Sequence, residues 1–330
     1  MIIFLLFSFW DYSYDLDVDF NYDNNVYAYS QEYIDDFING VRQYRFPFET
    51  YDDLITSFDF TLLVRNKFID KRTTTFSIDL NTDNYLLNRQ KNYQRYTFGI
   101  RQSFGRYAVK LSYQVIPGYL IRYYRDPYDG STDYIGCEVT YHTARGKISF
   151  MTLHDITLIA GYAHRWDNYI PEFNRYDASG HVVSFGLEKM LRKRIDFAFG
   201  YEFRNSYTDS ADASTSGVDI TPDGSFYQHT LSGNLSVQMV AVLPTTMKLS
   251  YNYSFRSYET STGEDSLHFG RIDHRHRIML GIYPRLITGL RLKLTLMRQW
   301  RRATSEVLSD INSIKDYTRY RAGAGFEFYY

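Results

Sequence analysis

The sequence predicts an all-β fold, a transmembrane antiparallel up-and-down β-barrel of about fourteen strands. Three observations lead to this prediction. Apolar and polar residues alternate with a period of two along much of the 330-residue chain. Tyrosine and phenylalanine are abundant, with 33 and 24 copies, although the mean hydropathy is only −0.41. Short turns alternate with long polar connections between the predicted strands.

The composition fits a barrel in a membrane. In such a barrel every second residue faces lipid, the others face a wet interior, and tyrosines gather at both interfaces. The net charge of −1 implies no nucleic-acid partner. The single Cys137 excludes an intrachain disulfide and a cysteine-based metal site, and we interpret it as a small apolar side chain. No cofactor is expected.

The alternation is clearest at residues 12–23, where large apolar residues occupy the even positions and serine, aspartate or asparagine the odd ones. A helix does not produce this pattern, because its side chains repeat about every 3.6 residues. The same alternation recurs at residues 57–64, 76–81, 95–101, 107–115, 195–204, 231–239, 247–255 and 290–296. Counting hairpins gives about fourteen strands, with both termini on the side of the short turns.

Two segments leave alternatives open. Residues 133–154 are too long for a simple strand, and their outward phase changes between Tyr141 and Ile148. A β-bulge explains the change within one strand, whereas a hairpin at residues 143–146 adds a strand. Residues 1–10 are apolar but too short for a spanning helix, so they are either a signal-peptide remnant or an extra strand. If both segments pair, the barrel has about sixteen strands; we favour fourteen, formed by residues 11–330.

The last predicted strand alternates up to the end of the sequence. Its apolar positions include Tyr320, Phe326, Phe328 and Tyr330. This strand resembles the C-terminal targeting strand of bacterial outer-membrane β-barrel proteins. The resemblance implies that the protein lies in the bacterial outer membrane, contacts the lipid bilayer and is inserted by the barrel-assembly machinery. It points to no particular family within this superfamily.

Closure of the barrel predicts two charged walls side by side. The inward positions of the first strands are acidic: Asp15, Asp17, Asp19, Asp59, Asp79 and Asp83. The inward positions of the last strands are basic: Arg271, Arg275, Arg277, Arg291, Lys293, Arg301, Arg319 and Arg321. Such walls resemble the eyelet of porins, where a transverse field orients dipolar solutes. The alternative is a network of mutual salt bridges that plugs the lumen.

The first long connection, at residues 24–53, also has two interpretations. Five apolar residues recur there at helical spacing, between a candidate N-cap and a glycine: Ser30, Tyr33, Ile34, Phe37, Ile38, Gly40 and Val41. A short amphipathic helix at this place would fold over or into the mouth of the barrel. The alternative is a hairpin that turns at Asn39-Gly40.

These features favour a porin-like outer-membrane channel for passive diffusion of small polar or charged solutes. One alternative is a closed structural barrel whose extracellular loops bind a protein partner, and another is a barrel-embedded hydrolase. No nucleophile elbow or H-E-x-x-H motif involves any of the eight histidines. His274 and His276 share one strand face, but they point outward and are too few for a zinc site. We therefore predict no enzyme activity and no catalytic or metal-binding residue.

Overall fold

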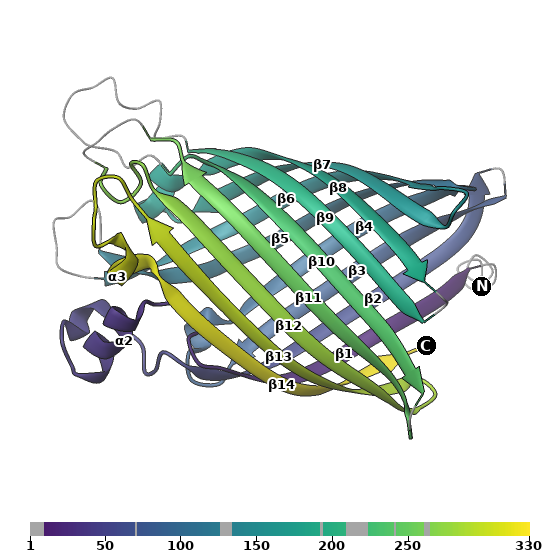
Figure 1. The fold of residues 1–330 in the computed structure, drawn as a ribbon, viewed down its shortest axis with the longest axis horizontal. Helices are drawn as coiled ribbons and strands as arrows, with labels where there is room; N and C mark the ends of the chain where they lie inside the picture. Colours follow the sequence, from purple (N-terminus) through teal and green to yellow (C-terminus); the bar gives the residue numbers. More distant parts are fainter. Residues whose placement is uncertain are drawn as a thin grey trace, which may run out of the picture.

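A computed structural model describes residues 10–69, 71–125, 134–191, 194–208, 224–240, 242–260 and 265–330. In these residues fourteen strands form one closed barrel, in which each strand pairs with its neighbours along the chain and β1 pairs with β14 (Figure 1). All pairings are antiparallel, which confirms the predicted fold class and the strand number. The strands are β1 (Asp11–Asp23), β2 (Asp53–Ile69), β3 (Arg72–Tyr85), β4 (Tyr93–Phe104), β5 (Tyr107–Arg125), β6 (Tyr134–Met151), β7 (Ile156–Tyr169), β8 (Ala178–Leu191), β9 (Ile195–Thr208), β10 (Phe226–Val240), β11 (Pro244–Tyr258), β12 (Ile272–Ile287), β13 (Leu290–Thr304) and β14 (Tyr317–Tyr329).

Short helices lie in the connections at one end of the barrel, which we call the loop end. The opposite end, where β1 begins and β14 finishes, is the turn end (Figure 1). No helix in the described ranges is long and apolar enough to cross a membrane. The helical segments are α2 (Gln31–Ile38), η1 (Gln43–Arg45), η2 (Arg89–Lys91), η3 (Pro171–Tyr176) and α3 (Ile311–Lys315).

The outer face of the barrel is apolar and aromatic. In β1, Tyr14, Phe20 and Tyr22 are 46%, 50% and 49% exposed, whereas Asp23 on the other face is fully buried at 0%. A water-soluble protein instead buries its apolar side chains and exposes its charged ones. An apolar outer face on a closed sheet fits a hydrocarbon environment, where every backbone polar group needs an internal partner.

The bulge that we expected within residues 133–154 lies in the neighbouring strand β5. The register between β5 and β6 shifts after Ile116, where Pro117 and Gly118 interrupt the ladder. Proline has no N–H to donate, so strands accept it at bulges, and Gly118 takes the positive φ of 55°. The expectation of a bulge within residues 133–154 is therefore wrong, because Pro117 and Gly118 place the irregularity in β5.

Strand β6 is continuous and keeps one register with β7, from Val139 opposite Tyr169 to Met151 opposite Thr157. The expected phase change within β6 is therefore wrong, and residues 143–146 form no hairpin. Val139 is 1% exposed and Cys137 is 3% exposed, so both are buried rather than directed outward. The burial of Cys137 agrees with its interpretation as a small apolar side chain.

The expected apolar segment 1–10 falls almost entirely outside the described residues, which begin at Trp10. The ring of Trp10 meets the ring of Phe68 edge to face, with centroids 5.2 Å apart.

The first long connection contains the helix and not the hairpin. The hydroxyl of Ser30 accepts a hydrogen bond from the backbone N–H of Tyr33 at 3.3 Å, which caps the N-terminus of α2. Gly40 follows the helix with a φ of 68°, a left-handed conformation that glycine adopts without strain. Of the predicted apolar positions, Ile38 remains 60% exposed.

Candidate functional site in the barrel interior

The acidic and basic walls meet at the seam where the sheet closes. Lys293 of β13 places its Nζ 2.9 Å from Oδ2 of Asp17 and 2.9 Å from Oδ2 of Asp19. Both aspartates belong to β1, which pairs with β14 and not with β13. The lysine side chain therefore crosses the inner face of β14 to reach them.

Glycine in β14 makes this crossing possible. Gly325 stands between Lys293 and Asp19 in the register of the three strands. A Cβ atom on Gly325 would lie 2.2 Å from Oδ1 of Asp19 and 2.3 Å from the carbonyl oxygen of Val18. Only a residue without a side chain leaves room for the ion pair, so glycine at this inward position of β14 has a physical reason.

A second contact closes the same seam nearer the loop end. Arg319 donates from Nε to both carboxylate oxygens of Asp23, at 2.9 and 2.7 Å. Arg321 donates from Nε to Oδ2 of the same carboxylate at 3.0 Å. Asp23 is fully buried, and two arginines from the last strand compensate its charge. The prediction listed both arginines and not this aspartate.

Arg271 and Arg301, which were predicted for the basic wall, form part of a buried cluster at the loop end. Arg271 donates to both oxygens of Asp273, at 2.8 and 2.6 Å. Arg301 lies 3.9 Å from the same carboxylate and donates from Nε to the carbonyl of Lys315 at 2.6 Å. Sequence reasoning missed Asp273, although it has the same phase in its strand as Arg275.

The remaining predicted cations have different surroundings. Arg291 donates to Glu327 at 3.0 Å. In the described part of the chain, neither Arg275 nor Arg277 has a carboxylate oxygen within the 4.0 Å of a salt bridge. Both stand on the same face of β12 as Asp273, because their positions differ from it by two and four residues. They therefore present uncompensated positive charge on the inner wall.

Asp59 of β2 and Asp79 of β3 line a polar cavity of about 270 Å³. Asn81 donates to Asp59, Thr61 donates to Asp79 at 2.9 Å, and Ser57 donates to Asp83 at 2.5 Å. In β1, one buried oxygen of Asp15 has no hydrogen-bond partner in the described residues. These carboxylates are thus held mainly by neutral donors rather than by arginines.

A second group of cations lies on the opposite side of the acidic wall, and sequence reasoning missed it. Arg101, Lys110 and Lys147 stand directly opposite one another on β4, β5 and β6. They have the inward phase of the polar positions in these strands, so the signal was present in the alternation. The acidic wall is consequently flanked by positive charge on both sides.

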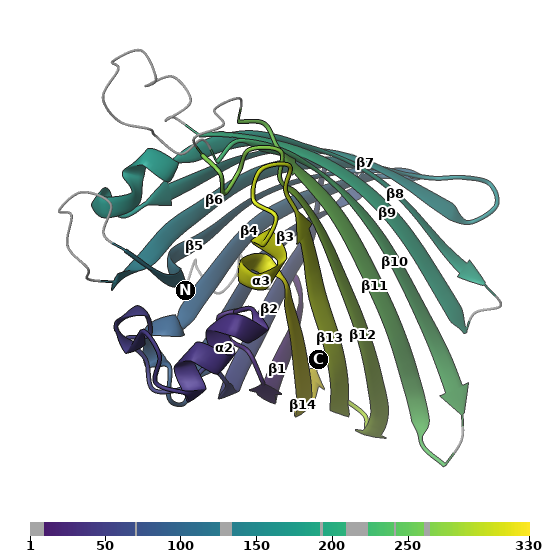
Figure 2. The same ribbon diagram turned by 60° about the vertical axis from the view of Figure 1, so that its left-hand side comes forward.

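The first loop, residues 24–52, is anchored over the loop end by contacts to both sides of the opening. Arg122 of β5 donates from Nε to the carbonyl of Tyr27 at 2.9 Å, and from Nη2 to that of Ala28. Asn25 donates to the carbonyl of Thr318 in β14 at 3.4 Å. Helix α2 contacts α3, which packs on β13. Figure 2 shows both helices at this end of the barrel.

Aromatic packing holds the first loop in this place. Its residues Val26, Tyr27, Tyr29 and Phe46 are buried together with side chains from β2, β3 and β5. The strands from β13 through β14 and β1 to β5 are seven of the fourteen in the ring. The loop therefore packs against strands from one half of the ring.

Lys91 of η2 lies beneath this loop with 2% of its surface exposed. Its Nζ donates to the carbonyls of Leu120 at 2.8 Å and Ile121 at 3.3 Å and lies 4.9 Å from the ring centroid of Tyr27. Burial lowers the pKa of Lys91 to about 7, and the positive charge of Arg319 adds to the effect.

The described carboxylates and histidines can be compared with the geometry of a metal site. In the described ranges, one group of potential metal ligands has its oxygens within 4.8 Å, namely Asp17, Asp19 and Asp59. The ammonium of Lys293 already neutralises two of them. Six of the eight histidines have the outward phase of their strands: His142, His164, His181, His229, His274 and His276.

Comparison with known proteins finds similarity in fold only. No protein-family model matches the chain, and no curated protein is similar to it in sequence. An anion-selective porin from Comamonas acidovorans superposes with a TM-score of 0.49 at 8% identity, over 97% of this chain and 99% of that one. The outer-membrane protein OmpT of Vibrio cholerae gives 0.45 at 8% identity, over 97% of each chain. OpdK from Pseudomonas aeruginosa with vanillate gives 0.42 at 10% identity, over 97% and 99%.

The architecture itself places the protein in its class. The sheet is closed and antiparallel with an even number of strands, its outer face is apolar and aromatic, and its long connections gather at one end. These are the properties of barrels that span the bacterial outer membrane with their loops outside the cell. The chain is a closed, fourteen-stranded antiparallel β-barrel with the architecture of bacterial outer-membrane barrels.

Proposed function

We propose that the protein is a channel through which small polar or charged solutes diffuse passively. The observation that carries this proposal is the pair Arg275 and Arg277, which present uncompensated charge on the inner face of β12. A barrel filled by mutual salt bridges would pair such cations, because an unpaired charge in a dry interior is costly. Uncompensated cations instead fit a wet lumen.

The charged walls on either side of the seam suggest how the channel would act on its solutes. The predicted acidic positions of β1, β2 and β3 lie between two groups of cations, Lys293 and Arg291 on one side and Arg101 and Lys110 on the other. Such an arrangement produces a field across the lumen, which orients dipolar solutes as they pass. The first loop acts as the constriction at the extracellular mouth.

The test is the single-channel conductance of the refolded protein in a planar bilayer, with the reversal potential measured under a salt gradient. We expect stable current steps that rise with salt concentration. The Arg275→Gln/Arg277→Gln variant should shift the reversal potential toward cation selectivity, because it removes two positive charges from the lumen.

The neighbouring strand offers a matched control. Arg298→Gln/Arg302→Gln removes the same charge from β13, from positions with the outward phase of Leu294 and Leu296, and should leave the selectivity unchanged. Absence of current from a correctly folded barrel would overturn the channel proposal and favour a closed barrel that acts through its loops. Equal shifts in both variants would place Arg275 and Arg277 outside the conducting path.

A further inference from the structure

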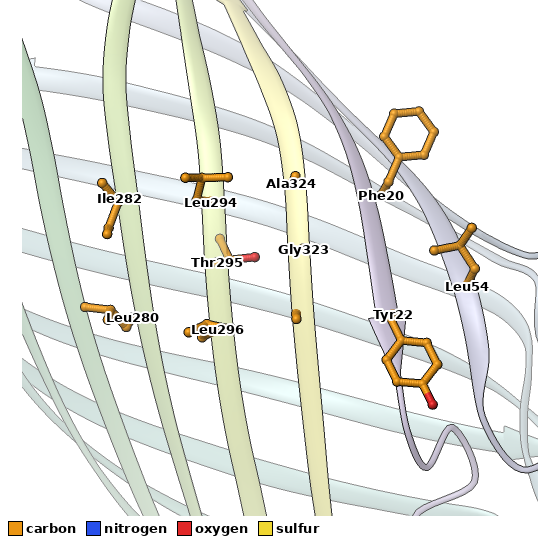
Figure 3. Close-up of a pocket in the computed structure, with 11 residues that line it drawn as sticks. Phe20, Tyr22, Leu54, Leu280, Ile282, Leu294, Thr295, Leu296, Gly323 and Ala324 are labelled. Atoms are coloured by element: carbon orange, nitrogen blue, oxygen red, sulfur yellow. The ribbon is translucent and has the colours of Figure 1, made fainter. Parts of the chain in front are cut away.

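The outer face of the barrel has an apolar groove along β14, with a volume of about 530 Å³. Ala324 lies on β14 between the two walls (Figure 3). Ala322 of the same strand also lines the groove. Leu294 and Leu296 of β13 form one wall, and Phe20 and Tyr22 of β1 form the other.

The register explains why the groove exists. One row across the three strands is Leu294, Ala324 and Phe20, and the next row is Leu296, Ala322 and Tyr22. Each row places a small residue between two large ones, so the depression continues along the direction of β14. A narrow apolar groove on a lipid-facing surface has the shape and chemistry of a site for a hydrocarbon chain.

A cation stands in line with the groove at its extracellular end. Arg298 follows Leu296 by two residues on the same face of β13 and lies opposite Tyr320 of β14. Its Cζ lies 5.2 Å from the ring centroid of Trp300 and 5.5 Å from that of Tyr320. These rings mark the level of the lipid headgroups, where tryptophan and tyrosine concentrate.

Arg298 is exposed on this face, and in the described ranges no carboxylate oxygen lies within salt-bridge distance of it. At the headgroup level a lipid-facing arginine costs little free energy, and the anions nearby are those of the lipid headgroups. The neighbouring Arg302 is different, because it donates to Asp316 at 2.8 Å. Within the described residues, no carboxylate neutralises Arg298, so its guanidinium can bind an anion from the lipid.

Histidine and tyrosine side chains adjoin this arginine. His276 stacks on Trp300 with ring centroids 4.8 Å apart and is hydrogen-bonded to the hydroxyl of Tyr251 at 2.9 Å. His274 makes the same bond to Tyr253 at 2.8 Å. The outer surface of β11 to β14 thus passes from an apolar groove to a polar aromatic band that contains one uncompensated cation.

We propose that this surface binds one anionic lipid of the outer leaflet, whose phosphate headgroup carries a net negative charge. An acyl chain lies in the groove over Ala322 and Ala324, and the phosphate of the headgroup accepts hydrogen bonds from the guanidinium of Arg298. Arginine is suited to this role because its planar donors match phosphate oxygens. The partner is identified by the combination of hydrocarbon groove and aligned cation, which no uncharged lipid would satisfy.

The experiment is native mass spectrometry of the purified barrel in neutral detergent. Phosphatidylglycerol and phosphatidylcholine with identical acyl chains are added in equal amounts. We expect one retained phosphatidylglycerol with a preference of about tenfold, the value of one charge-assisted hydrogen bond. Arg298→Gln should bring the two lipids close to parity. Arg89→Gln, which removes an exposed arginine from η2, is the charge-matched control and should keep the preference.

A second pair of variants tests the groove. Ala324→Leu fills it and should reduce retention of both lipids, whereas Ala160→Leu adds the same side chain at an exposed outward position of β7 and should not. Heat-modifiable migration on a gel verifies that every variant is folded. An unchanged preference in Arg298→Gln would overturn the proposal. So would a dimer that Ala324→Leu dissociates, because the groove would then belong to an interface between two copies of the chain.

Discussion

Lys293 and Asp19 belong to strands that do not pair, yet Nζ of the lysine lies 2.9 Å from Oδ2 of the aspartate across the inner face of Gly325. The contact joins β13 directly to β1 and thereby fastens the seam of the barrel from inside. It depends on three residues at once, and each can be tested separately.

The Gly325→Ala substitution should destabilise the barrel. The new Cβ would lie 2.2 Å from Oδ1 of Asp19, and overpacking of this kind costs about 1–3 kcal/mol. Urea unfolding in detergent or lipid measures the loss. Gly233→Ala is the control, because a Cβ at Gly233 meets nothing within 4 Å, and a strand residue there is expected to be neutral or stabilising by about 0.4–1 kcal/mol. Equal losses in the two variants would contradict the steric explanation.

The Lys293→Met substitution should lower stability by about 1–3 kcal/mol, because it leaves two carboxylates without their charged donor. A wet lumen keeps this value below that of a dry ion pair. The double variant Lys293→Met/Asp19→Asn should recover part of the loss in a double-mutant cycle. Strict additivity of the two single losses would show that the amine and the carboxylate do not interact in the folded protein.

The packing of the first loop should depend on pH through Lys91. Its pKa of about 7 in the folded state is below that of an unfolded lysine, which is about 10.4. Between these values the unfolded state binds more protons, so loop stability rises with pH, by at most about 1.4 kcal/mol per pH unit, and is constant below pH 7. Hydrogen-exchange protection of residues 24–52 between pH 6 and 10 measures this. Lys91→Met should remove the slope, and an unchanged slope would assign it to another group.

The Arg122→Ala substitution should release the first loop. It removes the hydrogen bonds to the carbonyls of Tyr27 and Ala28 and a guanidinium 5.0 Å from the ring of Tyr29. Trypsin should then cut faster after Arg42 and Arg45, and under the proposed function the conductance should rise. Faster cleavage without a change in conductance would mean that the loop does not constrict the path.

Substitution of Tyr330 should affect insertion of the barrel in cells more than the stability of the folded barrel. The backbone N–H and C=O of Tyr330 pair with Tyr14 at 3.0 and 3.1 Å, and the two rings stack with centroids 5.6 Å apart. Tyr330→Ala retains the backbone bonds, so the refolded barrel should lose no more than about 1.5 kcal/mol. We propose that the barrel-assembly machinery recognises this strand, so the amount inserted in cells should fall much further. Parallel losses in both assays would indicate a purely structural role.

The strands were predictable because alternation is a local property. A lipid-facing residue at every second position, as in residues 12–22, fixes both the strand and its inner face without knowledge of any partner. The bulge in β5 was missed for a different reason. Pro117 and Gly118, which cause the bulge, lie in β5. The phase change in the sequence that suggested a bulge lies in the neighbouring strand, β6.

The pairing of charges inside the barrel was only partly predictable. The phase places Arg271 and Arg301 on the inner face, but the phase does not reveal that Asp273 neutralises them. Likewise, no sequence rule brings Lys293 to Asp19, since the contact depends on an absent side chain in a third strand. The burial of Lys91 could not be predicted from the sequence either, because it results from the packing of the first loop, residues 24–52, over η2.

The contact between Asp23 and its two arginines has a temporal consequence. Asp23 lies at the end of the first strand, whereas Arg319 and Arg321 belong to the last. The two arginines of β14 are synthesised after β1 to β13, so the carboxylate lacks these partners until β14 has been made. Any chain that loses its final strand keeps an unneutralised acid where the ring should close. The free energy of burying Asp23 therefore favours closure of the ring only when β14 lies beside β1.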